Sequence, residues 1–366
     1  MLTGWNLLVA APVFVTGYAV RNDFRLAYGA ALVGLRGGYG RLYDLSAQRE
    51  AILGLGPGFN PQPFISPPPL AWLVTPFTVM PFTAALVIWS VLLIAALLWT
   101  WYLLAPGEGL SKAAHLVLWV GAFPVAFGVM VGQPGALVAA AVATAWWLIR
   151  ADRPVLAGLA FSLLVLKPQL ALLVPAALLV AGYRKTFASW LVASVVIGLV
   201  ALALLGGDGV ARYRDVLAQT QTAAWDITRR YSISGPLGLG WSLRAAEVAV
   251  LVVTLVVAWR QRHNPELVIA AGIVGSLLFT PYLGFQDFLM LFVAGWLVIR
   301  AGASTLQVGL LVVGYALLEL ALVVLAIPIL VAEVLLLGSL LWSFRTSGVT
   351  DALPGPSMRA SGVRRA

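Results

Sequence analysis

The chain has 366 residues, of which 61% are hydrophobic and only 10% are charged, so it lacks the polar surface of soluble domains. We therefore expect an integral membrane protein, and soluble enzymes are excluded. The absence of cysteine excludes disulfides and thiol catalysis, and the two histidines, His115 and His263, form no zinc motif. The net charge of +9 comes from basic residues between apolar runs, which favours anionic lipid or phosphate over nucleic acid as the partner.

The chain begins with an apolar stretch and a polar loop. Residues 2–20 are uncharged and lack the basic start and the small-residue cleavage pattern of a removable signal, so they predict a retained first span. Residues 21–64 form a polar loop that is long for a connector. Within it, Phe24, Tyr28, Leu32 and Leu35 recur at helical spacing, with Arg25, Gly29 and Arg36 opposite. This pattern predicts a helix lying in the membrane interface.

The remainder of the chain is a series of apolar runs. Together with the first span they predict an all-α polytopic membrane protein with about twelve transmembrane helices. A short apolar segment at residues 67–80 contains several prolines, which favours a half-helix or re-entrant piece. We expect one membrane domain over residues 1–344, with a second long loop at residues 207–240, and a disordered cytoplasmic tail at residues 345–366. The later spans are predicted at residues 82–105, 113–131, 134–149, 154–167, 168–183, 187–206, 241–259, 266–281, 286–300, 304–323 and 327–344.

The short connectors predict the orientation. With the amino terminus inside, most short-loop lysines and arginines, such as Lys112, Arg150 and Arg300, fall on one side, which should be cytoplasmic. The opposite side receives both long loops and the turns Gly132-Gln133-Pro134, Lys167-Pro168-Gln169 and Thr280-Pro281-Tyr282. Together these polar features indicate a site on the extracytoplasmic face.

Asp23 is the first candidate for chemistry on that face. It follows the first span by a few residues, where a carboxylate can meet a substrate at the membrane surface and accept a hydroxyl proton. The structural alternative is that Asp23 caps the helix beginning at Phe24.

Several other polar residues on the outer face are candidates for binding. Arg229 and Arg230 lie on an extracytoplasmic loop, against the usual charge bias, and call for an anionic ligand or acidic pairing. Lys167 ends a span directly before proline and either faces a ligand or reaches the headgroups. Gln133 and Gln169 are suited to hydrogen-bonding a sugar or phosphate, or a helix end. An ionisable group near the start of a span, such as Asp287, is a functional candidate, whereas Glu319 and Glu333 are read as paired or protonated within the bundle.

The sequence has no Walker A pattern, no Asp-x-Asp for a metal-bound sugar nucleotide and no Gly-x-Gly-x-x-Gly fingerprint. A nucleotide donor is therefore unsupported, and we expect neither a metal nor a cofactor.

A set of short motifs occurs in one order along residues 20–300: Asp23-Phe24 with Tyr28, Leu42-Tyr43-Asp44, Ser66-Pro67-Pro68-Pro69, Gly132-Gln133, Ala157-Gly158, Lys167-Pro168-Gln169, and Thr280-Pro281-Tyr282 with Asp287. In this order the chain resembles glycosyltransferase family 87, of the GT-C superfamily of membrane transferases that use polyprenyl-phosphate sugars.

The resemblance implies an inverting membrane hexosyltransferase. Its donor would be a polyprenyl-phosphate-linked sugar, mannose in the best-known members, and its acceptor a lipid or glycan outside the cytoplasm, at a bacterial inner membrane. Asp23 matches the expected general base. Lys167, Arg229 and Arg230 would bind the donor phosphate. The substrate would contact Tyr28, Asp44, Gln133, Gln169, Tyr282 and Asp287.

Two other classes stay open. About twelve spans with intramembrane Asp287, Glu319 and Glu333 would suit a proton-coupled secondary transporter, although no inverted repeat is visible. A protein that binds or flips lipid-linked sugars would need the same phosphate contacts without needing Asp23 as a base.

Overall fold

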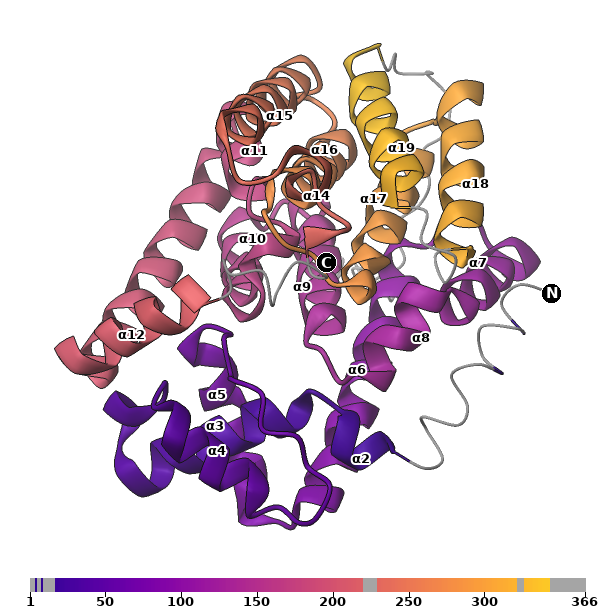
Figure 1. The fold of residues 1–366 in the computed structure, drawn as a ribbon. Coiled ribbons are helices and arrows are strands. Elements are labelled where there is room, and N and C mark those ends of the chain that lie inside the picture. Colours follow the sequence, from indigo (N-terminus) through magenta and orange to yellow (C-terminus); the bar gives the residue numbers. More distant parts are fainter. Residues whose placement is uncertain (1–3, 5–7, 9–16, 220–228, 321–325, 343–366) are drawn as a thin grey trace, which may run out of the picture.

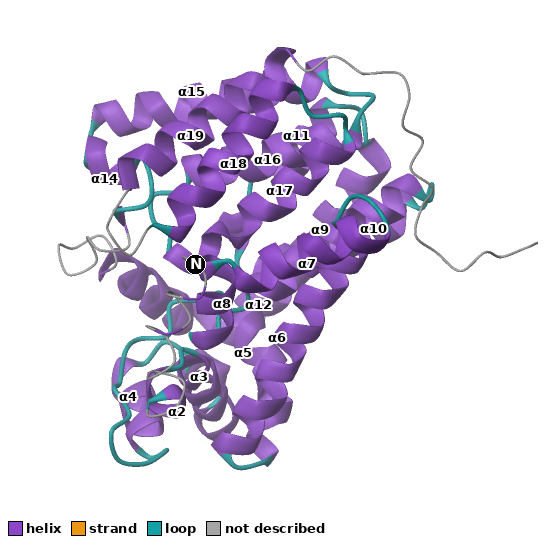
Figure 2. Ribbon diagram, turned by 90° about the vertical axis from the view of Figure 1, so that its right-hand side faces the viewer, coloured by secondary structure: helices purple, strands orange, loops and turns teal. Residues whose placement is uncertain are grey.

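A computed structural model describes residues 4, 8, 17–219, 229–320 and 326–342, and throughout this part the chain forms helices joined by loops, with no strand (Figures 1 and 2). The all-α class is therefore confirmed for the described part. Most of the predicted first span and the whole tail at residues 345–366 lie outside the described residues.

Short helices near the amino terminus form a separate layer at the lower end of Figure 1. The helix predicted from its periodicity is present as α3, but Arg25, expected on its polar side, is 3% exposed. It is buried because the backbone oxygen of Asn60 and the side chain of Gln62 accept its hydrogen bonds. The helices of this layer are α2 (Tyr18–Arg21), α3 (Phe24–Gly37), η1 (Tyr39–Arg41), α4 (Leu45–Leu53), α5 (Pro68–Val74) and η2 (Thr75–Val79).

Three helices are long and apolar enough to cross a membrane, namely α6 (Phe82–Leu104), α12 (Arg184–Gln219) and α15 (Trp241–Arg260). A fourth crossing is possible if α7 (Gly109–Gly121) and α8 (Phe123–Met130), which meet at 55°, count as one broken span. The predicted total of about twelve spans is not confirmed.

The other helices are shorter than a full crossing. The predicted span at residues 168–183 contains only η4 and the seven-residue α11, because Pro168 begins one short helix and Pro175 lies in the first turn of the next. Seven residues rise about 10 Å, a third of the hydrocarbon thickness of about 30 Å. These helices are α9 (Gly135–Arg150), α10 (Pro154–Phe161), η3 (Ser162–Leu166), η4 (Pro168–Leu170), α11 (Val174–Val180), α14 (Ser234–Leu237), α16 (Pro265–Phe279), η6 (Phe285–Phe288), α17 (Leu289–Arg300), α18 (Thr305–Glu319), α19 (Ala326–Ser339) and η8 (Leu340–Trp342).

The second predicted loop is partly helical. α12 continues past residue 207 to Gln219 after a break at Gly206, whose φ of 62° and ψ of −178° are not helical. Beyond the break α12 reaches the amino-terminal layer, where Arg212 donates to the backbone oxygen of Gly40 at 3.0 Å. Tyr213 stacks on Tyr43 with ring centroids 4.2 Å apart. The segment therefore joins the layer to the bundle.

The core of the bundle lies around α16, whose residues from Pro265 to Leu278 are all buried. α16 packs against α11, α15, α17 and α19. α10 and α12 pack closely against each other at Gly158, where a Cβ atom would lie 2.4 Å from the backbone oxygen of Thr186. A glycine at this crossing lets the two backbones approach, as small residues do between membrane helices.

We expect Gly158→Ala to lower stability by about 1–3 kcal/mol, because the added methyl overlaps the α12 backbone. Gly198→Ala is the matched control, since a Cβ at that position in α12 meets nothing within 4 Å. The control should be neutral or stabilising, because alanine favours helix over glycine by about 1 kcal/mol. Thermal unfolding of the purified protein in detergent measures both, and equal behaviour of the two variants would refute the close crossing.

Candidate active site

A cavity of about 510 Å³ lies between the amino-terminal layer and the bundle, a size suited to a small ligand. The turns at residues 132–134 and 167–169 and the segment around residues 281–287 all contribute to its wall. Four side chains that carry charge line it: Asp23, Lys167, Arg229 and Asp287. The structure therefore brings together residues from opposite ends of the sequence.

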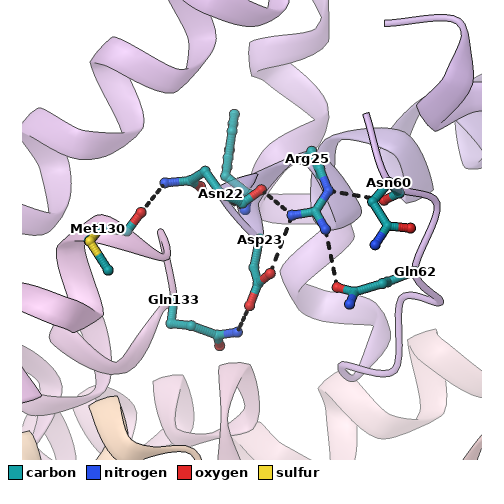
Figure 3. A network of polar contacts seen from close by, with 8 residues as sticks. Asn22, Asp23, Arg25, Asn60, Gln62, Met130 and Gln133 are labelled. Atoms are coloured by element: carbon teal, nitrogen blue, oxygen red, sulfur yellow. Dashed lines mark hydrogen bonds and ion pairs between the residues drawn. The ribbon is translucent and has the colours of Figure 1, made fainter. Parts of the chain in front are cut away.

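Asp23 is positioned by a hydrogen bond of its own backbone N–H and by the contacts of the preceding residue, Asn22, while its carboxylate lines the cavity (Figure 3). The Asp23 N–H donates to the backbone oxygen of Val131 at 2.7 Å, and the Asn22 amide donates to that of Met130 at 2.9 Å. The N–H of Phe24 is capped by the side chain of Asn22, at 2.9 Å, and Asp23 makes no capping hydrogen bond with its side chain. Asp23 occupies the N-cap position of α3, but its carboxylate is not used as a cap, which was the alternative role considered from the sequence.

The Asp23 carboxylate has a different partner on each oxygen (Figure 3). Oδ1 lies 3.4 Å from the guanidinium of Arg25, and Oδ2 accepts from the Gln133 amide at 2.8 Å. The Asp23 side chain is 30% exposed, whereas that of Arg25 is 3% exposed. The carboxylate is thus oriented by two groups and still open to the cavity.

A buried ion pair also lines the cavity. The Lys167 ammonium contacts Oδ1 of Asp287, and the two residues are only 8% and 1% exposed. The other oxygen, Oδ2, accepts from the Gly284 N–H at 3.1 Å, which fixes the turn after Tyr282. A buried pair of this kind is stable only when both charges keep their partners.

Gln133 bridges the two carboxylate sites. Its amide nitrogen donates to Asp23, and its oxygen accepts from the Lys167 ammonium at 3.2 Å. This orientation satisfies both contacts, because only the NH₂ group can donate to a carboxylate and only the oxygen can accept from an ammonium. The bridge connects Asp23 to Lys167 and Asp287 in one network.

Gln169, Tyr282 and Arg229 also line the cavity. Burial raises the pKa of Tyr282, and the charge of Asp287 raises it further. The backbone before Tyr282 is held by serine hydroxyls, since Ser232 and Ser234 both donate to the backbone oxygen of Pro281.

Three predicted site residues lie elsewhere. Tyr28 is 4% exposed and its hydroxyl donates to the backbone oxygen of Met80 at 2.8 Å. Asp44 caps α4 by accepting from the N–H groups of Ser46 and Ala47. The hydrogen bond from the Ser46 hydroxyl, with those from the Ala47 N–H and Arg41, holds the pKa of Asp44 below its usual value. Arg230 is exposed and does not line the cavity.

The sequence analysis missed residues that position this site. Asn22 is fully buried and makes two of the bonds that place Asp23. Gln62 lines the cavity while it accepts from Arg25 at 3.1 Å. The position of Asn22, next to Asp23 and before a helix, was an available signal for a cap, whereas nothing in the local pattern singles out Gln62.

An apolar helical bundle with one cavity that gathers carboxylates, cations and amides defines a membrane protein that handles a polar substrate. The chain belongs to glycosyltransferase family 87, whose family model matches residues 64–281. Membership implies glycosyltransferase activity and confirms the resemblance found in the sequence. The match includes Gln133, Lys167 and Arg229, while Asp23 precedes it. No curated protein and no solved structure matches the chain.

The cap at Asp44 can be separated from its charge. We expect Asp44→Ala to lower the free energy of unfolding by about 1 kcal/mol, because α4 loses its cap. Asp44→Asn should cost much less, since asparagine caps helices equally well.

Because the folded-state pKa of Asp44 is lowered, its charge contributes stability above the unfolded pKa of about 3.9. That part is lost as the pH falls below this value towards the folded pKa. Denaturant unfolding at pH 7 and pH 3 tests both effects, and an Asp44→Asn loss as large as that of Asp44→Ala would contradict the cap.

Proposed function

We propose that this membrane glycosyltransferase transfers a hexose, mannose-like, from a polyprenyl-phosphate donor to a lipid or glycan acceptor. The cavity would face outward from a bacterial inner membrane. The observation that carries the proposal is the Asp23 carboxylate, which is oriented by Arg25 and Gln133, is open to the cavity and makes no capping hydrogen bond. A donor carried on a lipid suits a chain rich in apolar helices and without a nucleotide motif.

Asp23 serves as the general base in this proposal. Its carboxylate takes the proton of the acceptor hydroxyl as that oxygen attacks the anomeric carbon. The new bond forms between the acceptor oxygen and the anomeric carbon while the bond from that carbon to the phosphate oxygen breaks. The configuration at the anomeric carbon inverts, and the polyprenyl phosphate leaves with the electron pair of the broken bond.

Lys167 and Arg229 stabilise the charge that develops on the leaving phosphate. An ammonium has three N–H donors. In Lys167 the oxygens of Asp287 and Gln133 take two of them, which leaves one for a phosphate oxygen. Charge stabilisation that strengthens in the transition state accelerates the reaction. We assign no phosphate contact to Arg230, because it lies outside the cavity lining.

Gln133 positions the base and the cation relative to each other. Its amide joins Asp23 to Lys167 through contacts of 2.8 and 3.2 Å. Gln169 and Tyr282 are the remaining groups of the cavity wall that we assign to the sugar or its phosphate. Asp287 acts through Lys167, whose ammonium it holds in the wall.

Asp23→Asn should lower sugar transfer about a hundredfold or more, because the substitution keeps the size of the side chain and removes the base. The measurement is transfer from a radiolabelled polyprenyl-phosphate hexose into membrane extracts. Asp44→Asn is the matched control and should transfer at the wild-type rate, since Asp44 caps α4 away from the cavity.

Transfer that survives in Asp23→Asn would move the base to another carboxylate. If wild-type protein transfers no sugar from any polyprenyl-phosphate donor, the proposed donor class is wrong, and flux assays for a carrier would follow.

Variants of the Lys167–Asp287 ion pair distinguish its effect on stability from its effect on sugar transfer. Lys167→Met leaves the buried Asp287 carboxylate without its cation, at a cost of about 3–5 kcal/mol, so it should lose both stability and transfer. The double variant Lys167→Met with Asp287→Asn removes both charges and keeps the acceptor for Gly284. It should regain stability but not transfer. Thermal unfolding and the transfer assay are measured together, and recovery of transfer in the double variant would exclude Lys167 from phosphate binding.

A further inference from the structure

A second cavity of about 380 Å³ is lined by residues of α7, α17, α18 and α19, four helices that Figure 1 labels. It shares no lining residue with the cavity that contains Asp23. Its wall is mostly aliphatic and aromatic, and its volume is that of a small-molecule pocket. It also lies largely beyond residue 281, where the match to the family model ends.

Glu333 on α19 faces this apolar cavity and is 2% exposed. Neither oxygen of its carboxyl group has a hydrogen-bond partner among the described residues. Glu319 on α18 is also buried, but its Oε1 accepts from the N–H of Phe123 at 3.0 Å. Leaving a buried polar group without a partner costs about 1–3 kcal/mol, so Glu333 calls for a group that the described protein does not supply.

The cavity has one further polar group whose orientation is defined. The indole N–H of Trp296 donates to Nδ1 of His115 at 3.2 Å, so Nδ1 of this imidazole acts as an acceptor. The proton of the neutral ring is then on Nε2. The wall therefore combines an unpartnered carboxyl group, an oriented histidine and a long apolar surface.

We propose that this cavity binds one uncharged, single-chain lipid-like molecule whose hydroxyl group hydrogen-bonds to Glu333. The apolar wall fits a hydrocarbon chain, and among the described residues it contains no lysine or arginine for an anionic headgroup. A hydroxyl both donates and accepts, so it satisfies a carboxyl group in either protonation state. The site is distinct from the proposed donor site and does not depend on the proposed reaction.

The chain offers a matched pair of variants for blocking the cavity. Gly314 lines it on α18, and a Cβ added there meets nothing within 4 Å, so Gly314→Leu fills the cavity without a backbone clash. Gly309 lies on the same helix with equally open space but does not line the cavity, so Gly309→Leu is the control.

The probe is a photoreactive sixteen-carbon alcohol with a diazirine in its chain, added to the purified full-length protein in detergent. We expect adducts on the cavity-lining segments of α18 and α19, located by mass spectrometry, and competition by unlabelled hexadecanol. Gly314→Leu should abolish this labelling, while Gly309→Leu should keep it. Glu333→Leu should weaken the apparent affinity about fivefold, the effect of one hydrogen bond. Glu333→Gln, which still donates and accepts, should bind like the wild type.

Two results would overturn the proposal. The first is labelling that Gly314→Leu and Glu333→Leu both leave unchanged, or that is absent from the cavity in the wild type. The second is labelling by the corresponding photoreactive alkane, which lacks the hydroxyl, that is as strong as labelling by the alcohol and is also reduced by an unlabelled competitor. That result would mean that the cavity binds hydrocarbon chains without recognising a hydroxyl group. Thermal unfolding of each variant verifies that it is folded, and Glu333→Leu should unfold at no lower temperature than the wild type, because it removes an unpartnered polar group.

Discussion

The buried pair of Lys167 and Asp287 is the interaction on which the rest of the site depends. Two charges that are only 8% and 1% exposed within an apolar bundle must remain together, because an isolated buried charge costs several kcal/mol. Lys167 lies between η3 and η4, and Asp287 lies in η6, so both belong to interrupted segments rather than to long helices. Such irregular backbone is tolerated inside a membrane where it is buried in protein or lines a cavity. The interrupted segments that contain Lys167 and Asp287 therefore lie at the wall of the polar cavity.

The contact between Asn22 and the turn at Gly132 fixes the other side of the site. Gly132 has a φ of +67°, and a Cβ there would lie 2.0 Å from Oδ1 of Asn22. Glycine thus allows both the turn and the close approach of the amide. The next residue along, Gln133, bonds to Asp23, while the Gly132 oxygen accepts from the indole of Trp89 at 2.9 Å. The distance from Asp23 to Lys167 is set by this turn, because the Gln133 side chain contacts both.

The sequence predicted the class of fold, the segments that meet at the cavity and several of the helices, but not where the shorter helices break. Apolar composition and periodicity identify helices such as α3 and α6, since both signals are local. The predicted total of about twelve crossings is not confirmed, because hydropathy counts apolar residues and does not register that the chain forms short helices near Pro168 and Pro175. Arg25 was read as polar surface because its covering loop, at Asn60 and Gln62, is far along the chain.

The same limit explains the individual site residues. Asp23, Gln133 and Lys167 each stand out at the end of an apolar run, where a polar residue is conspicuous, and the structure brings them to one cavity. Tyr28 and Asp44 stand out equally in sequence, yet their polar atoms are used locally, by Met80 and by the first turn of α4. The residues that line the cavity differ from those that bond locally only in where their side chains point, and that orientation follows from tertiary packing.

The base and the cations of the proposed reaction belong to different parts of the molecule. Asp23 comes from the amino-terminal layer, before the residues that match the family model, whereas Lys167 and Arg229 lie within the match. The layer meets the bundle through few polar contacts, chiefly those of Asn22 and Asp23 with residues 130–133 and that of Arg212 with Gly40. A substrate that touches both walls would therefore add to the forces that hold the layer against the bundle. In the proposed reaction, donor binding at Lys167 would be coupled to the alignment of Asp23, because Gln133 contacts both side chains.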